Sequence, residues 1–213
     1  MDFEERRNNL VNKLKREGRI YTKEVEKAFL EVPRELFVPK HLINYAYVDS
    51  PLEIGSGQTI SAPHMVAIMV EALCIQKGQK ILEIGAGSGY HAAIVSKLIG
   101  NKGQIYTIER YEKLVKFAKQ NLQNADVKNV IVKKGDGSIG LSKHAPYDRI
   151  YVTCAAPSIP EPLINQIKDN GKMLIPIGYT ICELELIEKK DKDIITKHLG
   201  GCAFVPLIGK YGH

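Results

Sequence analysis

The residues Lys80–Leu98, KILEIGAGSGYHAAIVSKL, decide the fold of this 213-residue chain. Lys80–Ile84 is an apolar, β-branched run of the kind that forms a buried strand. Glycines follow at three alternate positions, and the apolar residues after Tyr90 recur with helical spacing. The stretch predicts a strand, a glycine turn and a helix. That arrangement places bare backbone N–H groups and a helix N-terminus beside any ligand bound there.

The spacing of the glycines indicates which ligand fits. A dinucleotide-binding loop has glycines at positions one, three and six, but here Gly85, Gly87 and Gly89 leave Tyr90 at the sixth position. A carboxylate that could bind ribose hydroxyls, Glu109, ends the next predicted strand. A nucleoside without a pyrophosphate fits best, and S-adenosyl-L-methionine is the first candidate. The alternative is an ordinary βα turn that binds no ligand.

The composition fits a single globular domain, with 44% hydrophobic and 25% charged residues. We divide the predicted domain, residues 1–213, into N-terminal helices with an active-site loop (1–75), a cofactor-binding βαβ core (76–180) and C-terminal strands (181–213). No apolar run is long enough to span a membrane, and Met1–Gly18 lacks the apolar core of a signal peptide. The cytoplasm is therefore the predicted location.

The net charge of +6 does not by itself indicate a nucleic-acid partner. A basic chain can bind nucleic acid, but the lysines here are scattered, with no run longer than two. A solvated surface is the favoured interpretation, and neither nucleic acid nor a membrane is expected as a partner. The cysteines form no CxxC pair and lie in apolar stretches, so buried free thiols are predicted at Cys74, Cys154, Cys182 and Cys202.

The pattern along the chain predicts an α/β protein with a doubly wound, mostly parallel sheet. Before the glycine turn we expect helices at 2–15 and 23–31, a helical lid at 34–41, and a helix at 64–73 with Met65, Ile68 and Met69 facing inward. Around and after the turn we expect strands at 80–84, 104–108, 129–133, 147–154 and 172–178, and helices at 90–98, 111–124 and 160–169. The alternating tail predicts antiparallel strands at 182–189, 194–199 and 202–205.

The segment Tyr45–Pro63 has no clear helical or strand period and is predicted to be a long functional loop. Polar residues gather at its end, namely Gln58, Thr59, Ser61 and His64. Two interpretations of Ser61 stay open. Its hydroxyl caps the helix that Pro63 begins, or it positions a substrate.

Three candidate ligand contacts follow three successive strands: the glycine turn, Glu109 and Asp136. In open α/β sheets the carboxyl ends of the strands border the ligand crevice. We expect the glycines to contact the methionine part of the cofactor, Glu109 the ribose and Asp136 the adenine amino group, with Glu83 orienting the turn. Alone, Asp136 would be an ordinary turn residue, but the three contacts together favour the cofactor.

The residues after the fourth strand limit the methyl acceptor. Enzymes that methylate exocyclic base nitrogens commonly have Asn or Asp followed by Pro-Pro and an aromatic residue, whereas residues 154–157 read CAAP. No cluster of carboxylates or histidines resembles a metal site that would activate a hydroxyl. A carboxylate acceptor needs no base, since it is ionised at neutral pH. Catalysis then reduces to positioning and desolvation, for which the Ser61 hydroxyl is the candidate.

Several stretches resemble the protein-L-isoaspartate (D-aspartate) O-methyltransferase family. They are DSPLEIGSGQTISAPHM (Asp49–Met65), VPRELFVP (Val32–Pro39), ILEIGAGSGY, GDGSIG, APYDRIYVTCAAPSIPEPLINQIKDNGKMLIPIG (Ala145–Gly178) and FVPLIG (Phe204–Gly209). The resemblance covers nearly the whole chain, and ISAPHM is its specific part. It implies a Rossmann-like class I S-adenosylmethionine-dependent methyltransferase that acts on the α-carboxylate of L-isoaspartyl residues in damaged proteins. The methyl ester then closes to a succinimide, and hydrolysis returns some L-aspartate.

The resemblance also implies roles for residues, with Ser61 as the catalytic residue, S-adenosyl-L-homocysteine as the product and no metal. Together with the strand-end pattern it predicts cofactor contacts at Gln58, Thr59, Ile60, Ser61, His64, Glu83, Gly85, Gly87, Glu109, Arg110, Asp136 and Gly137. The damaged peptide is expected at Ile54, Ser61, Val205, Pro206 and Leu207. Two alternatives remain: a small-molecule or nucleic-acid methyltransferase on the same scaffold, and a binding module that has lost activity.

Overall fold

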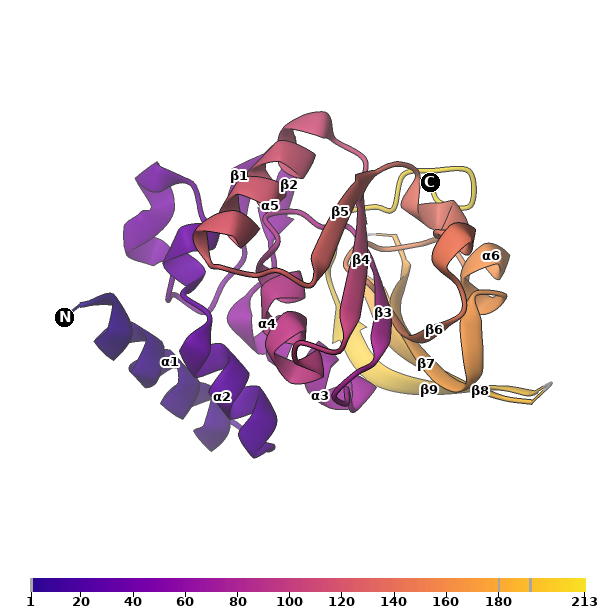
Figure 1. Cartoon of the computed structure of the whole chain (residues 1–213), viewed down its shortest axis with the longest axis horizontal. Coiled ribbons are helices and arrows are strands. Elements are labelled where there is room, and N and C mark those ends of the chain that lie inside the picture. The colour runs from indigo at the N-terminus through magenta and orange to yellow at the C-terminus, as the bar shows by residue number, and fades with distance from the viewer. Residues whose placement is uncertain (1, 180, 192) are drawn as a thin grey trace.

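The computed structural model describes residues 2–179, 181–191 and 193–213, and it contains a large sheet flanked by helices (Figure 1). The strands of this sheet are β3 (Lys80–Ile84), β4 (Gln104–Glu109), β5 (Val130–Lys134), β6 (Tyr147–Val152), β7 (Ile167–Gly178), β8 (Cys182–Lys190) and β9 (Asp193–Cys202). They run in the order β5-β4-β3-β6-β7-β8-β9. Strands β3 to β7 pair in parallel, whereas β8 and β9 are antiparallel additions at one edge. The predicted doubly wound, mostly parallel sheet is confirmed.

The order of strand addition reverses at β3. Strands β4 and β5 lie on one side of β3, and β6 and β7 lie on the other. Ligands bind outside the carboxyl ends of the strands at such a switch point. The glycine turn that follows β3 therefore lies where the sheet opens a crevice.

Helices cover the two faces of the sheet unequally. One buried cluster packs five helices against sheet residues such as Ile81 and Ile105. These helices are α1 (Phe3–Arg16), α2 (Lys23–Glu31), α3 (Pro63–Leu73), α4 (Tyr90–Ile99) and α5 (Glu112–Asn124). The opposite face packs Leu82 and Ile84 against Leu163 of the short helix α6 (Glu161–Ile164). Neighbouring residues of β3 thus point to opposite cores, as strand geometry requires.

Helix α2 begins at the predicted residue, Lys23, and α1 begins at Phe3, one residue after its predicted start. The Asp2 carboxylate accepts the Glu5 N–H at 2.8 Å at the start of α1, and the Thr22 side chain caps α2. Both helices lie at the side of the domain, and α2 contacts α4 (Figure 1). The predicted lid at 34–41 forms two short 3₁₀ helices, η1 (Arg34–Phe37) and η2 (Lys40–Tyr45). The two helices are separated at Pro39, because a proline disfavours helical backbone in the residue that precedes it.

The segment 45–63 is more ordered than predicted. It contains a two-stranded hairpin, β1 (Leu52–Gly55) and β2 (Gln58–Ile60). The turn residues Ser56 and Gly57 have φ angles of 55° and 68°. The prediction of a loop without strands was wrong, because strands of four and three residues are too short to show a two-residue period.

Three further predictions need correction. The helix predicted at 160–169 is only α6, and β7 already begins at Ile167. A strand at 202–205 does not form, since β9 is a single strand that ends at Cys202. In α3 the buried face includes Val66 and Val70, whereas Met65 and Ile68 are half-buried.

The cysteines are free, as predicted, but they are not all buried. Cys154 and Cys182 are buried, Cys202 is half-buried and Cys74 is exposed. Cys74 lies at the C-terminal cap of α3 with a φ of 48°, where the chain leaves the core. Within the described residues, no helix combines the length and apolarity needed to cross a bilayer.

Candidate active site

A cleft lies at the carboxyl ends of β3, β4 and β6. It is open to the surface and encloses about 770 Å³ of empty space, part of which is open solvent. Its walls come from residues 58–61, the glycine turn and start of α4, residues 108–111, and the C-terminal stretch 205–208. The fold thus brings together four segments that are far apart in the sequence.

The backbone N–H groups of the glycine turn already donate hydrogen bonds within the protein. The N–H groups of Gly85 and Ala86 donate to the Ile108 carbonyl at 2.8 and 3.2 Å, and the Gly89 N–H donates to the Ala86 carbonyl at 2.8 Å. The Gly87 N–H donates to the Glu109 carboxylate. The prediction of bare N–H groups is therefore wrong for these four residues, and they are not available to a phosphate. S-adenosylmethionine carries no phosphate, so this turn fits it better than it fits a dinucleotide.

Glu109 holds the glycine turn and also lines the cleft. Its carboxylate is 6% exposed and accepts the Gly87 N–H at 3.0 Å and the Tyr111 N–H at 2.9 Å, one on each oxygen. A carboxylate oxygen has two acceptor positions, so each still has one available for a ribose hydroxyl. The geometry fits the role predicted from the sequence.

Asp136 fastens the C-terminal stretch and does not line the cleft. Its Oδ1 accepts from the Ser138 N–H and hydroxyl, and its Oδ2 accepts the Lys210 N–H at 2.8 Å. Burial opposes ionisation, but these bonds outweigh it and hold the pKa of Asp136 below its usual range. The adjacent Gly137 does line the cleft. A contact between Asp136 and adenine stays a prediction.

Glu83 lies in the core beneath the glycine turn, outside the cleft. The strand register places it beside Thr107 and Tyr151, and none of the three is exposed. In the described part of the chain neither Glu83 carboxyl oxygen has a hydrogen-bond partner, so it makes no hydrogen bond to the turn. Burial raises the pKa of Glu83 to about 8, so the side chain is neutral at pH 7. The sequence pattern did not indicate this environment, because it depends on the pairing of β3 with β4 and β6, which are distant in the sequence.

His91 completes this polar layer from α4. Its ring centroid lies 4.4 Å from that of Tyr151. Burial lowers the pKa of His91 to about 3, so the imidazole is neutral. His91 also lines the cleft, and the sequence analysis missed it, because its place within the apolar spacing of α4 resembles a core position.

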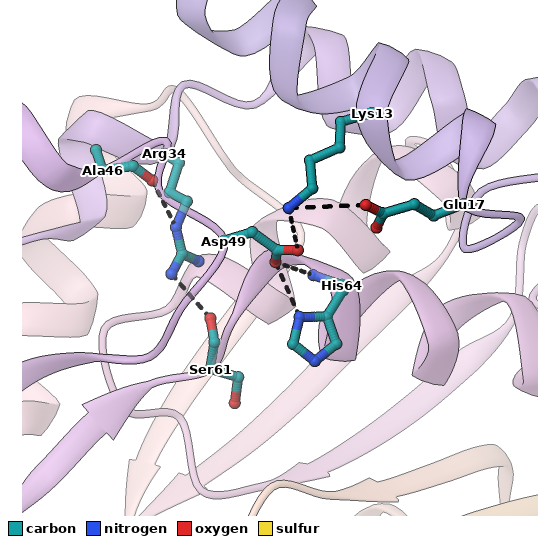
Figure 2. Close-up of polar contacts among 7 residues, drawn as sticks. All are labelled: Lys13, Glu17, Arg34, Ala46, Asp49, Ser61 and His64. Carbon is teal, nitrogen blue, oxygen red and sulfur yellow. Dashed lines mark hydrogen bonds and ion pairs between the residues drawn. The ribbon is translucent and has the colours of Figure 1, made fainter.

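Ser61 does not cap α3, so one of the two interpretations left open by the sequence is excluded. The cap residue is Ala62, which has no side chain that could accept a hydrogen bond. Within the described residues the Ser61 hydroxyl has no partner, and the residue lines the cleft. Its carbonyl accepts a hydrogen bond from Arg34 at 2.8 Å (Figure 2). The hydroxyl is therefore available to a ligand.

The Asp49 side chain caps the start of α3, although it lies 15 residues before His64 in the sequence. Its Oδ1 accepts both the backbone N–H and the ring Nδ1 of His64 at 2.9 Å, and its Oδ2 lies 3.3 Å from the Lys13 ammonium (Figure 2). The bonds fix the His64 ring at the start of α3, and they link it to α1. Burial opposes ionisation of Asp49, but the hydrogen bonds from His64 outweigh it and hold the pKa of Asp49 below its usual range.

This low pKa predicts a pH dependence of stability. A carboxylate whose folded pKa is depressed contributes stability above its unfolded pKa, and loses it as pH falls through the folded value. The change Asp49→Asn removes one charged acceptor, which is worth about 1 kcal/mol and so about 2–4 °C in Tm at pH 7. The gap in Tm between the two proteins should be constant above about pH 5 and should narrow as the pH falls below about 4, through the lowered folded pKa of Asp49. Calorimetry at pH 7, 5 and 3 tests this, and a gap that stays constant down to pH 3 would contradict it.

Most predicted site residues line the cleft. Lining residues among the predictions are Gln58, Thr59, Ile60, Ser61, Gly85, Gly87, Glu109, Arg110, Gly137, Val205, Pro206 and Leu207. Four predicted residues are not among those that line the cleft, namely Ile54, His64, Glu83 and Asp136. Tyr90 and Thr153 line the cleft but were not predicted. Among the described side chains, no group of three His, Cys, Asp or Glu residues could hold a metal ion.

Comparison with known proteins agrees over nearly the whole chain. The family model described as protein-L-isoaspartate(D-aspartate) O-methyltransferase matches residues 5–212. A protein-L-isoaspartate O-methyltransferase of Methanococcus aeolicus is 52% identical over 95% of this chain and 94% of its own length. One from Pyrococcus abyssi is 50% identical over 100% of this chain and 99% of its own length.

Solved structures give the same result. A protein-L-isoaspartate O-methyltransferase aligns with a TM-score of 0.89 at 33% identity, over 97% of this chain and 67% of the other. A candidate enzyme of the same kind from Plasmodium falciparum, in complex with S-adenosyl-L-homocysteine, aligns with a TM-score of 0.84 at 27% identity, over 94% and 97% of the two chains. The strand order, the cleft and these relatives together place the chain in the protein-L-isoaspartate(D-aspartate) O-methyltransferase family, within the Rossmann-like class I methyltransferases.

Proposed function

We propose that this chain transfers a methyl group from S-adenosyl-L-methionine to the α-carboxylate of L-isoaspartyl residues in damaged peptides and proteins. The resulting methyl ester leads through a succinimide to L-aspartate, so the reaction repairs the main chain. The observation that supports this best is the position of the Ser61 hydroxyl, which has no hydrogen-bond partner among the residues that the structure describes. It shares one cleft with Glu109 and the glycine turn.

S-adenosylmethionine supplies a methyl group on a sulfonium sulfur, and S-adenosyl-L-homocysteine remains after transfer. The chain itself has to bind, orient and desolvate the acceptor. Glu109 offers free acceptor positions for ribose hydroxyls, and the turn of residues 85–89 offers close backbone contact. The acceptor carboxylate is ionised at neutral pH, so Ser61 needs only to hold it in line by donating its hydroxyl hydrogen.

We propose that Val205, Pro206 and Leu207 wall the peptide side of the cleft. Ala155 holds this stretch, because its N–H donates to the Val205 carbonyl at 2.8 Å and its carbonyl accepts the Leu207 N–H at 2.7 Å. An open cleft with backbone walls suits damaged peptides of varied sequence. Isoaspartyl peptides and proteins are the proposed partners, and the cytoplasm is the proposed location, since free cysteines fit a reducing compartment.

The deciding experiment uses two synthetic peptides that differ only in one Asp or isoAsp linkage. Each is incubated with methyl-labelled S-adenosylmethionine, and the base-labile methyl ester is counted. We expect label on the isoAsp peptide alone. Label on neither peptide, with the cofactor still bound, would remove the repair function and favour a small-molecule or nucleic-acid acceptor.

The change Ser61→Ala should lower kcat much more than cofactor affinity. Loss of one hydrogen bond to a charged group is worth about 1.5–3 kcal/mol, so kcat should fall roughly 10- to 150-fold. The dissociation constant of S-adenosyl-L-homocysteine should stay within about threefold, since the hydroxyl acts on the acceptor. Ser50→Ala, the same change in the same segment but outside the cleft, serves as the control. An equal loss of turnover and cofactor affinity would argue against a positioning role.

A further inference from the structure

Arg34 is a fully buried cation placed beside the cleft, and nothing in its sequence context predicts this position. It lies in η1, and its guanidinium contacts two backbone carbonyls. Its Nε donates to the Ala46 carbonyl at 2.9 Å and its Nη2 donates to the Ser61 carbonyl at 2.8 Å (Figure 2). Burying a charge is costly unless it is hydrogen-bonded, so a buried arginine at this place calls for an explanation.

The two carbonyls stand at opposite ends of one segment. Residues 46–61 leave η2, form the β1–β2 hairpin and return to the cleft at Ser61. A guanidinium is planar and donates in a rigid fork, so a single side chain fixes both ends of this segment. The hairpin is therefore closed at its base by Arg34.

The same guanidinium also contacts the start of α4. Its central carbon lies 4.7 Å from the centre of the Tyr90 ring, within the range of a cation–π interaction. Tyr90 follows the glycine turn directly and lines the cleft. Arg34 thus connects the segment that carries Ser61 with the helix that begins at the cofactor side of the cleft.

We propose that Arg34 is a positioning residue, which holds the Ser61 main chain against the glycine turn so that the serine hydroxyl meets the acceptor. This inference rests on the proposed function of Ser61. The geometry of the guanidinium fork is required, and its charge alone is insufficient, because only the fork reaches both carbonyls and the Tyr90 ring.

The test is Arg34→Lys, which keeps the charge and removes the fork. Arg149 provides a matched control, since it is also buried and donates from Nε to a carbonyl, that of Leu73, at the opposite end of α3 from Ser61. For Arg34→Lys we expect kcat on the isoAsp peptide to fall about 30-fold, with the KM for peptide and the dissociation constant of S-adenosyl-L-homocysteine within about threefold. For Arg149→Lys we expect a loss of Tm similar to that of Arg34→Lys, but a kcat within about threefold of the wild-type value.

Hydrogen exchange supplies a readout that needs no methylation. Amides in residues 58–66 should exchange faster in Arg34→Lys and should be unchanged in Arg149→Lys. If the wild-type protein methylates no isoaspartyl peptide, the proposed function fails, whereas the exchange difference still decides whether Arg34 holds Ser61. If Arg34→Lys does not fold, Arg34→Gln, which keeps a single donor nitrogen and so also lacks the fork, is judged by the same values. The proposal is overturned if the Arg34 variant matches the Arg149 variant in both kcat and exchange.

Discussion

Replacing Glu109 with glutamine is expected to weaken the binding of S-adenosyl-L-homocysteine about 100-fold, since two losses combine to about 3 kcal/mol. The Glu109 carboxylate accepts one backbone N–H on each oxygen, from Gly87 and from Tyr111. An amide has the same shape but only one acceptor oxygen. Its NH₂ group must face one of these buried N–H donors, so the glycine turn loses an anchor. If Glu109 binds the ribose as proposed, the ribose would also lose a charged acceptor.

Isothermal titration with S-adenosyl-L-homocysteine measures this effect directly. Glu112→Gln is the matched control three residues later, because the Glu112 side chain is 50% exposed and pairs with Lys134 at 3.2 Å outside the cleft. An exposed ion pair contributes little, so the control should bind within about twofold of wild type. Binding by Glu109→Gln within the same range would remove Glu109 as the ribose anchor.

Local signals in the sequence predicted the centre of the fold well. The boundaries of β3 are those predicted, and α4 extends one residue further, to Ile99. An apolar β-branched run that ends in closely spaced glycines is a strong local pattern. The end of the next strand was predicted within one residue, at Ile108, which is why Glu109 could be named before its contacts were known, whereas the strand predicted at 147–154 already ends at Val152.

Contacts between distant segments could not be predicted in this way. Asp49 caps α3 across 15 residues, and Arg34 reaches Ser61 across 27 residues. Neither spacing corresponds to a helix or strand period, so no pattern marks these residues. The turn N–H groups show the same limit, because their partners Ile108 and Glu109 lie on the next strand. The sequence therefore located the site but not the hydrogen bonds that hold it.

The change Gly85→Ala is expected to lower Tm by about 6–12 °C, which corresponds to about 3 kcal/mol for a chain of this size. Gly85 has a φ of +93°, a conformation that costs a residue with a Cβ roughly 1–2 kcal/mol. A Cβ there would also lie 2.4 Å from the Thr153 hydroxyl oxygen. That hydroxyl donates to the Ile84 and Gly85 carbonyls. The alanine must therefore displace Thr153 and shift the turn, which should also weaken cofactor binding more than about tenfold.

A control substitution at Gly78 separates the two causes of this loss, which are backbone strain and contact with Thr153. It has a φ of +81°, but a Cβ at Gly78 would meet no atom within 4 Å. Gly78→Ala should therefore cost only the strain of about 1–2 kcal/mol and leave cofactor binding unchanged. In a Thr153→Ala background the obstructing oxygen is gone, so Gly85→Ala should cost about as much as Gly78→Ala. Denaturant unfolding of the wild type, Gly85→Ala, Thr153→Ala and the double variant measures the coupling between the two positions. A full-sized loss in the Thr153→Ala background would show that contact with Thr153 is not why this position requires glycine.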